Sequence, residues 1–336
     1  MTVKSRLLEL LEQHRGETLS GEELARELSC TRAAVWKAVK TLREEGYHID
    51  AGTNRGYVLS PDSHRLSLEA IRLHLREPQV YMRLYQQISS TNQEAKKAAI
   101  QREAGHGAFV LALEQTEGRG RRGRSFYSPR GGGLYLSVVL EPKDTIQSSL
   151  LLTTGAAAAV CMAVEEVCGV SLDIKWVNDL YKDGKKVCGI LTEAVTDFES
   201  GSIEFAIVGI GLNLYLEEKA LPEELKGLAG SVYASGEEAG RADLNRLAAG
   251  IVNHLLEETR RKALSPEYVR RSILPGRDIL VMDKERVRPA KALELCPDGR
   301  LLIQEEDGSR RQLSYEEVSV RMRADGARDA GGKEKR

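Results

Sequence analysis

The sequence predicts an α+β protein of several domains: a winged helix-turn-helix, a central mixed β-sheet with helices, and a small C-terminal β-barrel. Three observations lead to this fold class. The first 60 residues contain three helical patterns and a hairpin pattern, and strand and helix patterns alternate from about residue 80. Residues 275–322 contain short strands with Gly and Pro turns. The chain has 336 residues, enough for two or three domains.

The N-terminal helices are indicated by apolar spacing and by capping signals. A first helix is predicted over residues 3–14, and Ser20 with Glu23 forms a capping box that starts the second. A third helix follows over residues 31–45, and residues 47–60 alternate as a β-hairpin would. Three short helices followed by a hairpin predict a winged helix-turn-helix, whose third helix enters the major groove of DNA.

The third helix concentrates positive charge. From Thr31 to Arg43 there are four basic and no acidic residues, whereas residues 1–62 contain nine basic and ten acidic residues. The candidate DNA-binding residues are Thr31, Arg32, Lys37, Lys40, Thr41 and Arg43 of this helix and Arg55 at the hairpin tip. The alternatives are a winged helix that mediates only protein contacts and a basic face that is merely solvated.

The changes of pattern along the chain set the expected domain boundaries. We expect the winged helix over 1–62, a linker with a short helix over 63–80, the central domain over 81–270, the barrel over 271–323 and a disordered tail over 324–336. Strand patterns occur at 108–114, 134–140, 173–177, 188–195 and 204–214, and helix patterns at 92–101, 149–169 and 244–264.

Composition narrows the function class. The chain has 49 basic and 50 acidic residues, so any nucleic-acid site must be local. The N-terminus is charged and unlike a signal peptide, and no apolar run approaches the roughly 18 residues of a membrane span. The five cysteines have neither a CxxC nor a metal-like spacing. We expect reduced thiols in a cytoplasmic protein that does not bind membranes.

The stretch GRGRRGR at residues 118–124 matches the dinucleotide-binding expression G-x-G-x-x-G. That motif requires a helix after the glycines, but here a loop and then a strand follow, so the Rossmann interpretation fails. A P-loop fails as well, because no GxxxxGK[ST] is present. The remaining interpretation is an arginine loop between two strands, suited to carboxylates or phosphates, with a solvated turn as the alternative.

Four further polar or glycine-rich stretches lie at strand ends, at 89–95, 175–180, 184–193 and 209–214. Each has an ordinary explanation. Thr91 with Glu94 would form a capping box, Asn178 with Asp179 a turn, and Lys186 would be a surface lysine. Five such features in one α/β region predict one polar site that binds an anion.

This combination closely resembles biotin protein ligases, specifically the bifunctional kind that also represses the biotin operon. The resemblance covers nearly the whole chain and rests on STNQEA (90–95), EQTEGRGRRGR (114–124), KWVNDLY (175–181), KKVCGIL (185–191) and GIGLN (209–213). It implies a class II synthetase-like catalytic domain and an SH3-like C-terminal barrel. Monofunctional members of the family lack the DNA-binding domain, so the first 60 residues indicate the bifunctional kind.

The resemblance implies a reaction in two steps. The carboxylate of biotin attacks the α-phosphate of ATP, with Mg²⁺ on the triphosphate, and gives biotinyl-5′-AMP. A lysine of a biotin carboxyl carrier protein, from acetyl-CoA carboxylase or another biotin-dependent carboxylase, then takes the biotinyl group. It also implies a homodimer that the adenylate promotes and that binds operator DNA of biotin synthesis genes.

The resemblance assigns roles residue by residue. Ser90, Thr91, Asn92 and Gln115 line the biotin site, and Arg119, Gly120 and Arg121 close over biotin and the adenylate. Lys186 meets the carboxylate and the α-phosphate, and Asp179 aids the incoming lysine or orients the metal. Phe126, Asn178, Asn213 and Arg321 contact the nucleotide; Phe126 stands where tryptophan is common, and its ring still stacks. Arg122 and Arg124 have no assigned role.

Three alternatives remain open. In the first, the protein acts only as a transcription factor, and its old catalytic domain is kept as a biotin sensor; Lys186 and the arginine loop argue against this. In the second, it is an enzyme like the lipoate ligases, which lack the arginine loop and the winged helix. In the third, it is a ligase whose winged helix is a relic.

Overall fold

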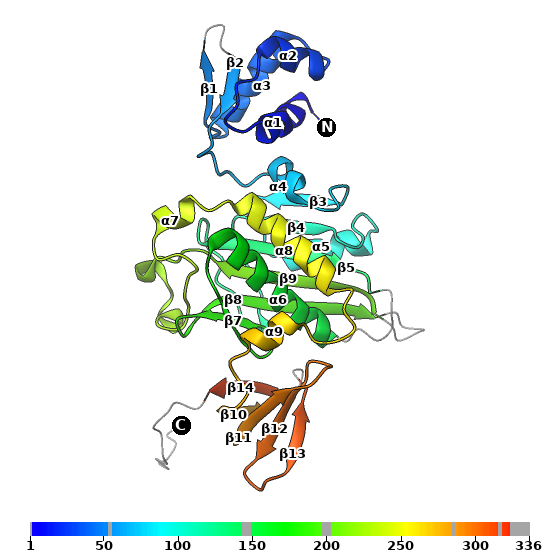
Figure 1. Cartoon of the computed structure of the whole chain (residues 1–336), viewed down its shortest axis with the longest axis vertical. Coiled ribbons are helices and arrows are strands. Elements are labelled where there is room, and N and C mark those ends of the chain that lie inside the picture. The colour runs from blue at the N-terminus through cyan, green and yellow to red at the C-terminus, as the bar shows by residue number, and fades with distance from the viewer. Residues whose placement is uncertain are drawn as a thin grey trace.

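The computed structural model describes residues 2–52, 56–142, 149–196, 203–283, 286–314 and 318–322. These residues form three groups that follow one another along the long axis of the molecule, with the N-terminal group at one end and a small C-terminal sheet at the other (Figure 1). The predicted hairpin-tip residue Arg55 and the tail 324–336 lie outside the described residues.

The N-terminal group is the predicted winged helix-turn-helix. Its elements are α1 (Val3–Gln13), α2 (Gly21–Glu27), α3 (Arg32–Glu44), β1 (Ile49–Gly52) and β2 (Gly56–Leu59). Ser20 and Glu23 form the predicted capping box, and Gly46 adopts a φ of 91°, which favours glycine, directly after α3. The helices and the hairpin share a buried cluster that includes Leu7, Val35 and Leu59.

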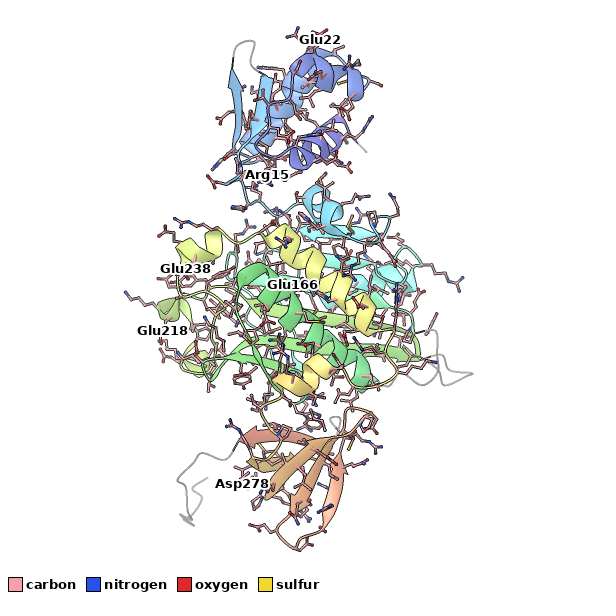
Figure 2. The ribbon with its side chains drawn as sticks, in the orientation of Figure 1. Arg15, Glu22, Glu166, Glu218, Glu238 and Asp278 are labelled. Carbon is pink, nitrogen blue, oxygen red and sulfur yellow. The ribbon has the colours of Figure 1, made fainter. Side chains whose placement is uncertain are left out.

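The connection from the hairpin to the central group, residues 60–67, is bonded to the N-terminal group at one end and to the central group at the other. Arg15, two residues after the end of α1, donates from Nη1 to the carbonyl oxygens of Ser60, Pro61 and Ser63 at 2.8–3.4 Å. Figure 2 shows Arg15 on the side of the N-terminal group that faces the central sheet. On the other side Asn245 accepts from the Ser67 N–H at 2.9 Å. Helix α4 (Leu68–His74) follows and packs against α8 (Leu244–Glu258).

The central sheet is mixed, as predicted, with the order β3-β4-β5-β9-β8-β7-β6. Its strands are β3 (Met82–Tyr85), β4 (Phe109–Ala112), β5 (Gly133–Leu140), β6 (Asp173–Lys175), β7 (Asp179–Lys182), β8 (Lys185–Thr196) and β9 (Ile203–Asn213). β3 pairs parallel with β4, and the other neighbours are antiparallel. The sequence patterns did not predict β3 and β7, because each is only four residues long and carries little alternation.

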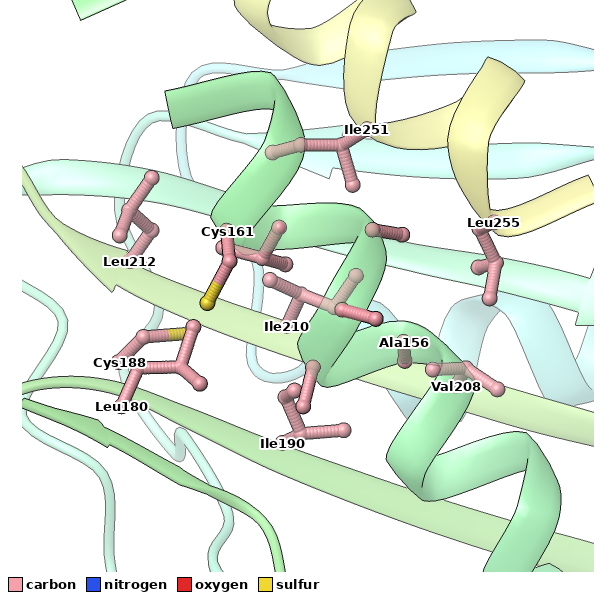
Figure 3. Packing of buried hydrophobic residues seen from close by; sticks show 14 of the residues in the cluster. Ala156, Cys161, Leu180, Cys188, Ile190, Val208, Ile210, Leu212, Ile251 and Leu255 are labelled. Atoms are coloured by element: carbon pink, nitrogen blue, oxygen red, sulfur yellow. The ribbon is translucent and has the colours of Figure 1, made fainter. Parts of the chain in front are cut away.

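Helices cover the two faces of this sheet unequally. α6 (Ser149–Cys168) and α8 pack on one face, where their side chains meet those of Val208, Ile210 and Leu212 on β9 (Figure 3). On the other face α5 (Thr91–Ile100) packs on β4, β5 and β9 through small alanine side chains. Because α5 has only ten residues, part of this second face remains available for a pocket.

Helix α6 corrects one expectation. It is 20 residues long and apolar enough, by length and composition, to cross a membrane. The sequence interpretation had found no apolar run of that length. However, 72% of the apolar window is buried inside the protein, against α8 and β8. Its apolar character is that of a core helix packed between a sheet and a second helix.

The C-terminal group is an open five-stranded antiparallel sheet with the order β13-β12-β11-β10-β14. Its strands are β10 (Asp278–Asp283), β11 (Arg286–Leu295), β12 (Leu301–Glu305), β13 (Arg310–Leu313) and β14 (Val318–Met322). The predicted closed barrel is not confirmed, because within the described residues β13 and β14 each pair with one neighbour. Three of the four residues of β13 are exposed, as on an edge strand. The inward side chains, such as Ile279 and Ile303, join the central core.

The remaining elements lie around the central sheet. They are η1 (Arg121–Gly123), η2 (Glu218–Ala220), η3 (Glu223–Leu225), α7 (Gly236–Gly240) and α9 (Pro266–Arg271). The path from β4 through η1 to the antiparallel β5 is the strand–loop–strand connection that the sequence predicted for the arginine loop.

Candidate functional site

A cavity of about 180 Å³ lies on the α5 side of the central sheet. Gly209 and Gly211 of the last polar stretch line it. Most of the predicted ligand-binding residues meet there too, and they come from the other four stretches of the chain. They are Ser90, Thr91, Asn92, Gln115, Arg119, Gly120, Arg121, Phe126, Asn178, Asp179 and Lys186. The five polar stretches therefore form one site.

Two glycines of β9 make room for the cavity side chains. A Cβ added at Gly209 would lie 2.1 Å from Asn92 Oδ1, and one added at Gly211 would lie 2.4 Å from the ring of Phe126. Both distances are far below van der Waals contact, so any side chain there would displace Asn92 or Phe126. The glycines of the GIGLN stretch therefore serve the close packing of these two side chains on the strand.

One end of the cavity is lined by uncharged side chains that are joined by hydrogen bonds, with the Glu193 carboxyl group behind them. Gln115 Oε1 accepts from the backbone N–H of Thr91 at 2.9 Å and from its hydroxyl at 3.0 Å. Asn92 donates to Glu193 at 2.6 Å, and the Ser137 hydroxyl donates to Asn92 Oδ1 at 2.6 Å. Thr91 and Asn92 are both about 95% buried, so these bonds fix the orientation of their side chains.

The capping-box alternative for this stretch is wrong. Ser90 is the residue before α5, and its side chain makes no capping hydrogen bond. Glu94 instead accepts from the hydroxyl of Tyr85 at 2.8 Å, and Thr91 is engaged with Gln115. That hydrogen bond, added to burial, raises the pKa of Tyr85 to about 12.

The other end of the cavity carries charge. Lys186 Nζ lies 2.5 Å from Asp179 Oδ1, with the two side chains 35% and 26% exposed. A register shift in the pairing of β7 with β8 places Lys186 opposite Tyr181 and Cys188 opposite Leu180. Residues alternate across a strand, so without this bulge Lys186 would share the α6 face with Cys188. The bulge directs the ammonium group into the cavity, where it lies beside Gly189.

The arginine loop between β4 and β5 forms one wall of the cavity. Gly120 N–H donates to the carbonyl of Arg124 at 2.7 Å, and Arg119 pairs with Ser125 as an isolated bridge. Arg121 donates from Nη1 to Oδ1 of Asn178 at 3.2 Å, and Asn178 in turn donates to the Ile190 carbonyl at 2.8 Å. The loop is thereby attached to the turn between β6 and β7.

Arg119 has a second partner at the start of α5. With its amide oriented to satisfy both groups, Gln93 accepts from the Arg119 guanidinium, Nη1 at 3.2 Å. The loop arginines thus reach both α5 and the β6–β7 turn. The guanidinium groups of Arg119 and Arg121 therefore line the same cavity as Lys186. Such groups suit planar anions such as carboxylate and phosphate.

The predicted nucleotide-binding residue Asn213 is not brought to the cavity. Its side chain is about 95% buried and donates to the Gly230 carbonyl at 3.2 Å. Asn213 shares a face of β9 with Gly209 and Gly211, but it is the last residue of the strand, where its side chain is bonded to the Gly230 carbonyl. Arg321 lies in β14, in the C-terminal sheet, and its side chain is outside the described residues.

Several lining residues escaped the sequence interpretation. Trp176, Lys175, Ser125, Ile190 and Leu191 line the cavity, as do the two arginines without an assigned role, Arg122 and Arg124. Trp176 and Lys175 belong to the KWVNDLY stretch, where only Asn178 and Asp179 were singled out as polar. Behind the lining, Ser137 and Glu193 orient Asn92, and only the pairing of β5, β9 and β8 reveals this.

The described residues contain no group of three or more His, Cys, Asp or Glu side chains that could hold a metal ion. The described cysteines are free. Burial raises the pKa of the Cys161 thiol to about 12 and also raises that of Cys188, so both remain protonated thiols near neutral pH. Figure 3 shows both side chains between α6 and the sheet, in the apolar core. The chemistry of the site therefore belongs to its lysine, arginines, carboxylates and amides.

The predicted DNA-binding face lies on α3. Arg32, Lys37 and Lys40 are exposed there. Two predicted contacts also have local roles: the Thr31 side chain caps α3 by accepting from Ala34 N–H, and Arg43 donates to the Ile49 carbonyl at 2.7 Å. Arg43 therefore ties the helix to the hairpin, although its side chain is exposed like that of Lys37.

Comparisons with known proteins agree with this arrangement. The family model described as the biotin/lipoate A/B protein ligase family matches residues 84–213, and an HTH domain model matches residues 3–58. The bifunctional ligase/repressor BirA of Bacillus spizizenii is 37% identical over 257 residues, 76% of this chain and 76% of that protein. The Escherichia coli protein of the same name is 28% identical over 333 residues, 95% of this chain and 98% of that protein.

A solved structure supports the fold independently. The biotin protein ligase from Aquifex aeolicus in complex with biotin and ATP matches with a TM-score of 0.59 and 27% identity. The match covers 72% of this chain and 99% of that one.

Proposed function

The chain belongs to the biotin/lipoate A/B protein ligase family, and we propose that it is a bifunctional biotin protein ligase and transcriptional repressor. It forms biotinyl-5′-AMP from biotin and ATP and transfers the biotinyl group to a lysine of a biotin carboxyl carrier protein. One observation carries this proposal: a single cavity joins an uncharged hydrogen-bonding end to a lysine and an arginine loop. Biotin has the matching chemistry, a neutral ureido ring at one end and a carboxylate at the other.

The uncharged end suits the ureido ring. Thr91, Asn92 and Gln115 supply oriented amide and hydroxyl groups, and Ser90 lines the same end. A neutral ring that both donates and accepts hydrogen bonds is recognised by such a set without the cost of burying a charge. We propose that Gly120 and the backbone of the arginine loop complete the enclosure of biotin.

The charged end suits adenylate formation. A biotin carboxylate oxygen attacks the α-phosphorus, a new O–P bond forms, and the bond to pyrophosphate breaks. Carboxylate and phosphate repel each other, and fixed cations offset this repulsion most strongly where charge develops in the transition state. Lys186, Arg119 and Arg121 supply these cations, and Phe126, Asn178 and Arg321 contact the nucleotide. Asn213 acts at most through the Gly230 segment that it touches.

Mg²⁺ enters as part of the substrate MgATP. The described part of the chain offers no metal-ligand cluster, and Asp179, the cavity carboxylate, is paired with Lys186. We propose that Asp179 then assists the second step, in which the acceptor amine loses a proton and attacks the acyl carbon while AMP leaves. The loop excludes water from the adenylate during this interval.

The test of the ligase is biotin-dependent exchange of labelled pyrophosphate into ATP. We expect exchange with biotin and none with lipoate in its place, because lipoate lacks the ureido ring. Absence of exchange with either acid would favour the alternative in which the protein only senses biotin. Exchange with lipoate alone would favour the lipoate ligase alternative.

The repressor activity is proposed from the winged helix and its basic α3. We propose that two chains form a homodimer promoted by biotinyl-5′-AMP, which places two α3 helices on a two-fold symmetric operator upstream of biotin synthesis genes. Binding to the chain's own upstream DNA, measured with and without biotinyl-5′-AMP, tests this. No adenylate-dependent shift would favour the alternative of a relic winged helix.

The proposed function also includes a location in the cell and a division of the chain into domains. We propose a cytoplasmic protein with its domains at 1–62, 81–270 and 271–323, the segment 63–80 between the first two, and an SH3-like fold for the third. The separate buried cluster of the N-terminal group supports the first boundary.

A further inference from the structure

Trp176 connects the cavity to the C-terminal sheet. The side chain lines the cavity and is 5% exposed. Its indole N–H points out of the site and donates to the carbonyl oxygen of Gly299, 123 positions along the chain, at 2.9 Å. A buried indole N–H requires a partner, because leaving it without one costs desolvation energy. The Gly299 carbonyl therefore selects one orientation of the indole ring.

The partner carbonyl is itself held firmly. Residues 296–300 form the turn between β11 and β12, closed by a hydrogen bond from Cys296 N–H to the Arg300 carbonyl at 2.8 Å. Gly299 has a φ of 86°, and a Cβ added to it would lie 3.1 Å from the side chain of Leu150 on α6. The turn therefore packs against α6.

Trp176 lies at the charged end of the cavity. It belongs to the turn between β6 and β7, which also carries Asn178 and Asp179. Asn178 holds the arginine loop and Asp179 is paired with Lys186. On the function proposed above, the nucleotide binds at this end, so the indole ring forms part of the wall of the nucleotide-binding site.

We propose that the turn at residues 296–300 is a positioning element for ATP, acting through the hydrogen bond from Trp176 to Gly299. The proposal rests on the proposed ligase function. Trp176 is the residue beside the ligand, and Gly299 is a positioning residue that acts through it. The C-terminal sheet thereby helps to set nucleotide affinity without lining the cavity at this point.

The test uses a Trp36→Phe parent of the full chain. The chain has two tryptophans, so this parent leaves Trp176 as its single fluorescent reporter. Gly299→Ala is built in this parent, with Gly308→Ala as the matched control. Gly308 has nearly the same φ, 83°, in another turn of the same sheet, and an added Cβ meets nothing within 4 Å. Trp176→Phe, which keeps a ring and removes the N–H, is the second variant.

In the Gly299→Ala protein we expect the KM for ATP in biotin-dependent exchange to rise about tenfold, with kcat and the KM for biotin within about twofold of the parent. We also expect the emission of Trp176 to shift to longer wavelength and its response to MgATP to shrink. Gly308→Ala should change neither reading. Trp176→Phe should raise the KM for ATP in the same way.

Two results would overturn the proposal. One is an unchanged KM for ATP in both Gly299→Ala and Trp176→Phe. The other is an equal change in Gly308→Ala, which would show a general effect of the sheet's stability. If the parent shows no exchange at all, the ligase assignment fails, and the emission of Trp176 in Gly299→Ala against Gly308→Ala still decides whether the turn positions the indole.

Discussion

Arg121 of the arginine loop donates a hydrogen bond to Asn178 of the β6–β7 turn, Nη1 to Oδ1, at 3.2 Å. Asn178 is fixed in its own orientation by donating to the Ile190 carbonyl. This contact ties the loop between β4 and β5 to the far side of the cavity. A connection of this kind allows the loop to close over a ligand and to be released again.

Replacing Arg121 with glycine should open the site. Without the bond to Asn178 the loop loses its attachment to the β6–β7 turn, and the adenylate is less protected from water and from diffusion. We expect Arg121→Gly to release free biotinyl-5′-AMP about tenfold faster and to label unrelated proteins with biotin. Chromatography of the released adenylate measures this. Arg130→Gly, which removes an exposed arginine bonded to Gln86 outside the cavity, is the control. Equal release from both variants would refute the role of the loop contact.

Adding one methyl group at Gly209 should impair biotin binding. The new Cβ would lie 2.1 Å from Asn92 Oδ1, so Asn92 must leave its bonds to Ser137 and Glu193. We expect Gly209→Ala to weaken biotin binding at least about tenfold, as overpacking at a buried polar network implies. Calorimetric titration with biotin gives the affinity. The control is Gly240→Ala, where an added Cβ meets nothing. Unchanged affinity in Gly209→Ala would separate Asn92 from the biotin site.

Lys37 should contribute one phosphate contact in the DNA complex. It is an exposed cation on α3, whereas Arg43 is occupied by the Ile49 carbonyl. We expect Lys37→Ala to weaken operator binding and to lower the slope of log affinity against log salt by about one. Lys4→Ala on α1, which removes the same charge from a lysine paired with Glu45, should leave the slope unchanged. A slope unaffected by either change would place the DNA elsewhere.

The buried thiol of Cys161 predicts how stability depends on pH. Burial raises its pKa in the folded protein to about 12, from 9.0 for an unperturbed thiol. A group with a raised folded pKa contributes its full stabilisation below its unfolded pKa and loses it as the pH rises from that value through the folded pKa. The free energy of unfolding should therefore fall as the pH rises from about 9 towards 12, as measured by urea titration. The fall should be smaller in Cys161→Ala; an identical fall in both proteins would contradict this.

Local sequence signals predicted much of this structure. The capping box at Ser20, the glycine after α3 and the apolar spacing of the first three helices all depend on neighbours a few residues apart. The polar stretches were also correctly expected to converge, because strand ends of one sheet meet at its edges. Local chemistry and the resemblance to a family were enough for these features.

Other features depend on contacts between distant segments, and no pattern in the sequence shows them. The bulge that turns Lys186 into the cavity arises from the pairing of β7 with β8. The bond of Trp176 to Gly299 joins a turn of the central sheet to a turn of the C-terminal sheet, and the Asn213 side chain is held by the Gly230 carbonyl. The open edge of the C-terminal sheet likewise reflects which strands pair, whereas the sequence shows only that strands are present.

The central claim is that this cavity makes a biotinyl adenylate and passes it to an acceptor lysine. The most direct measurement is the mass of a biotin-carrier domain after incubation with the protein, biotin and MgATP. We expect the mass to increase by one biotinyl group, and we expect no increase when ATP is omitted. Lys186→Met should reduce the rate of this modification at least about a hundredfold. Lys185→Met, which replaces the neighbouring exposed lysine, should retain activity. An unmodified carrier domain with the unaltered protein, or full activity in Lys186→Met, would contradict it.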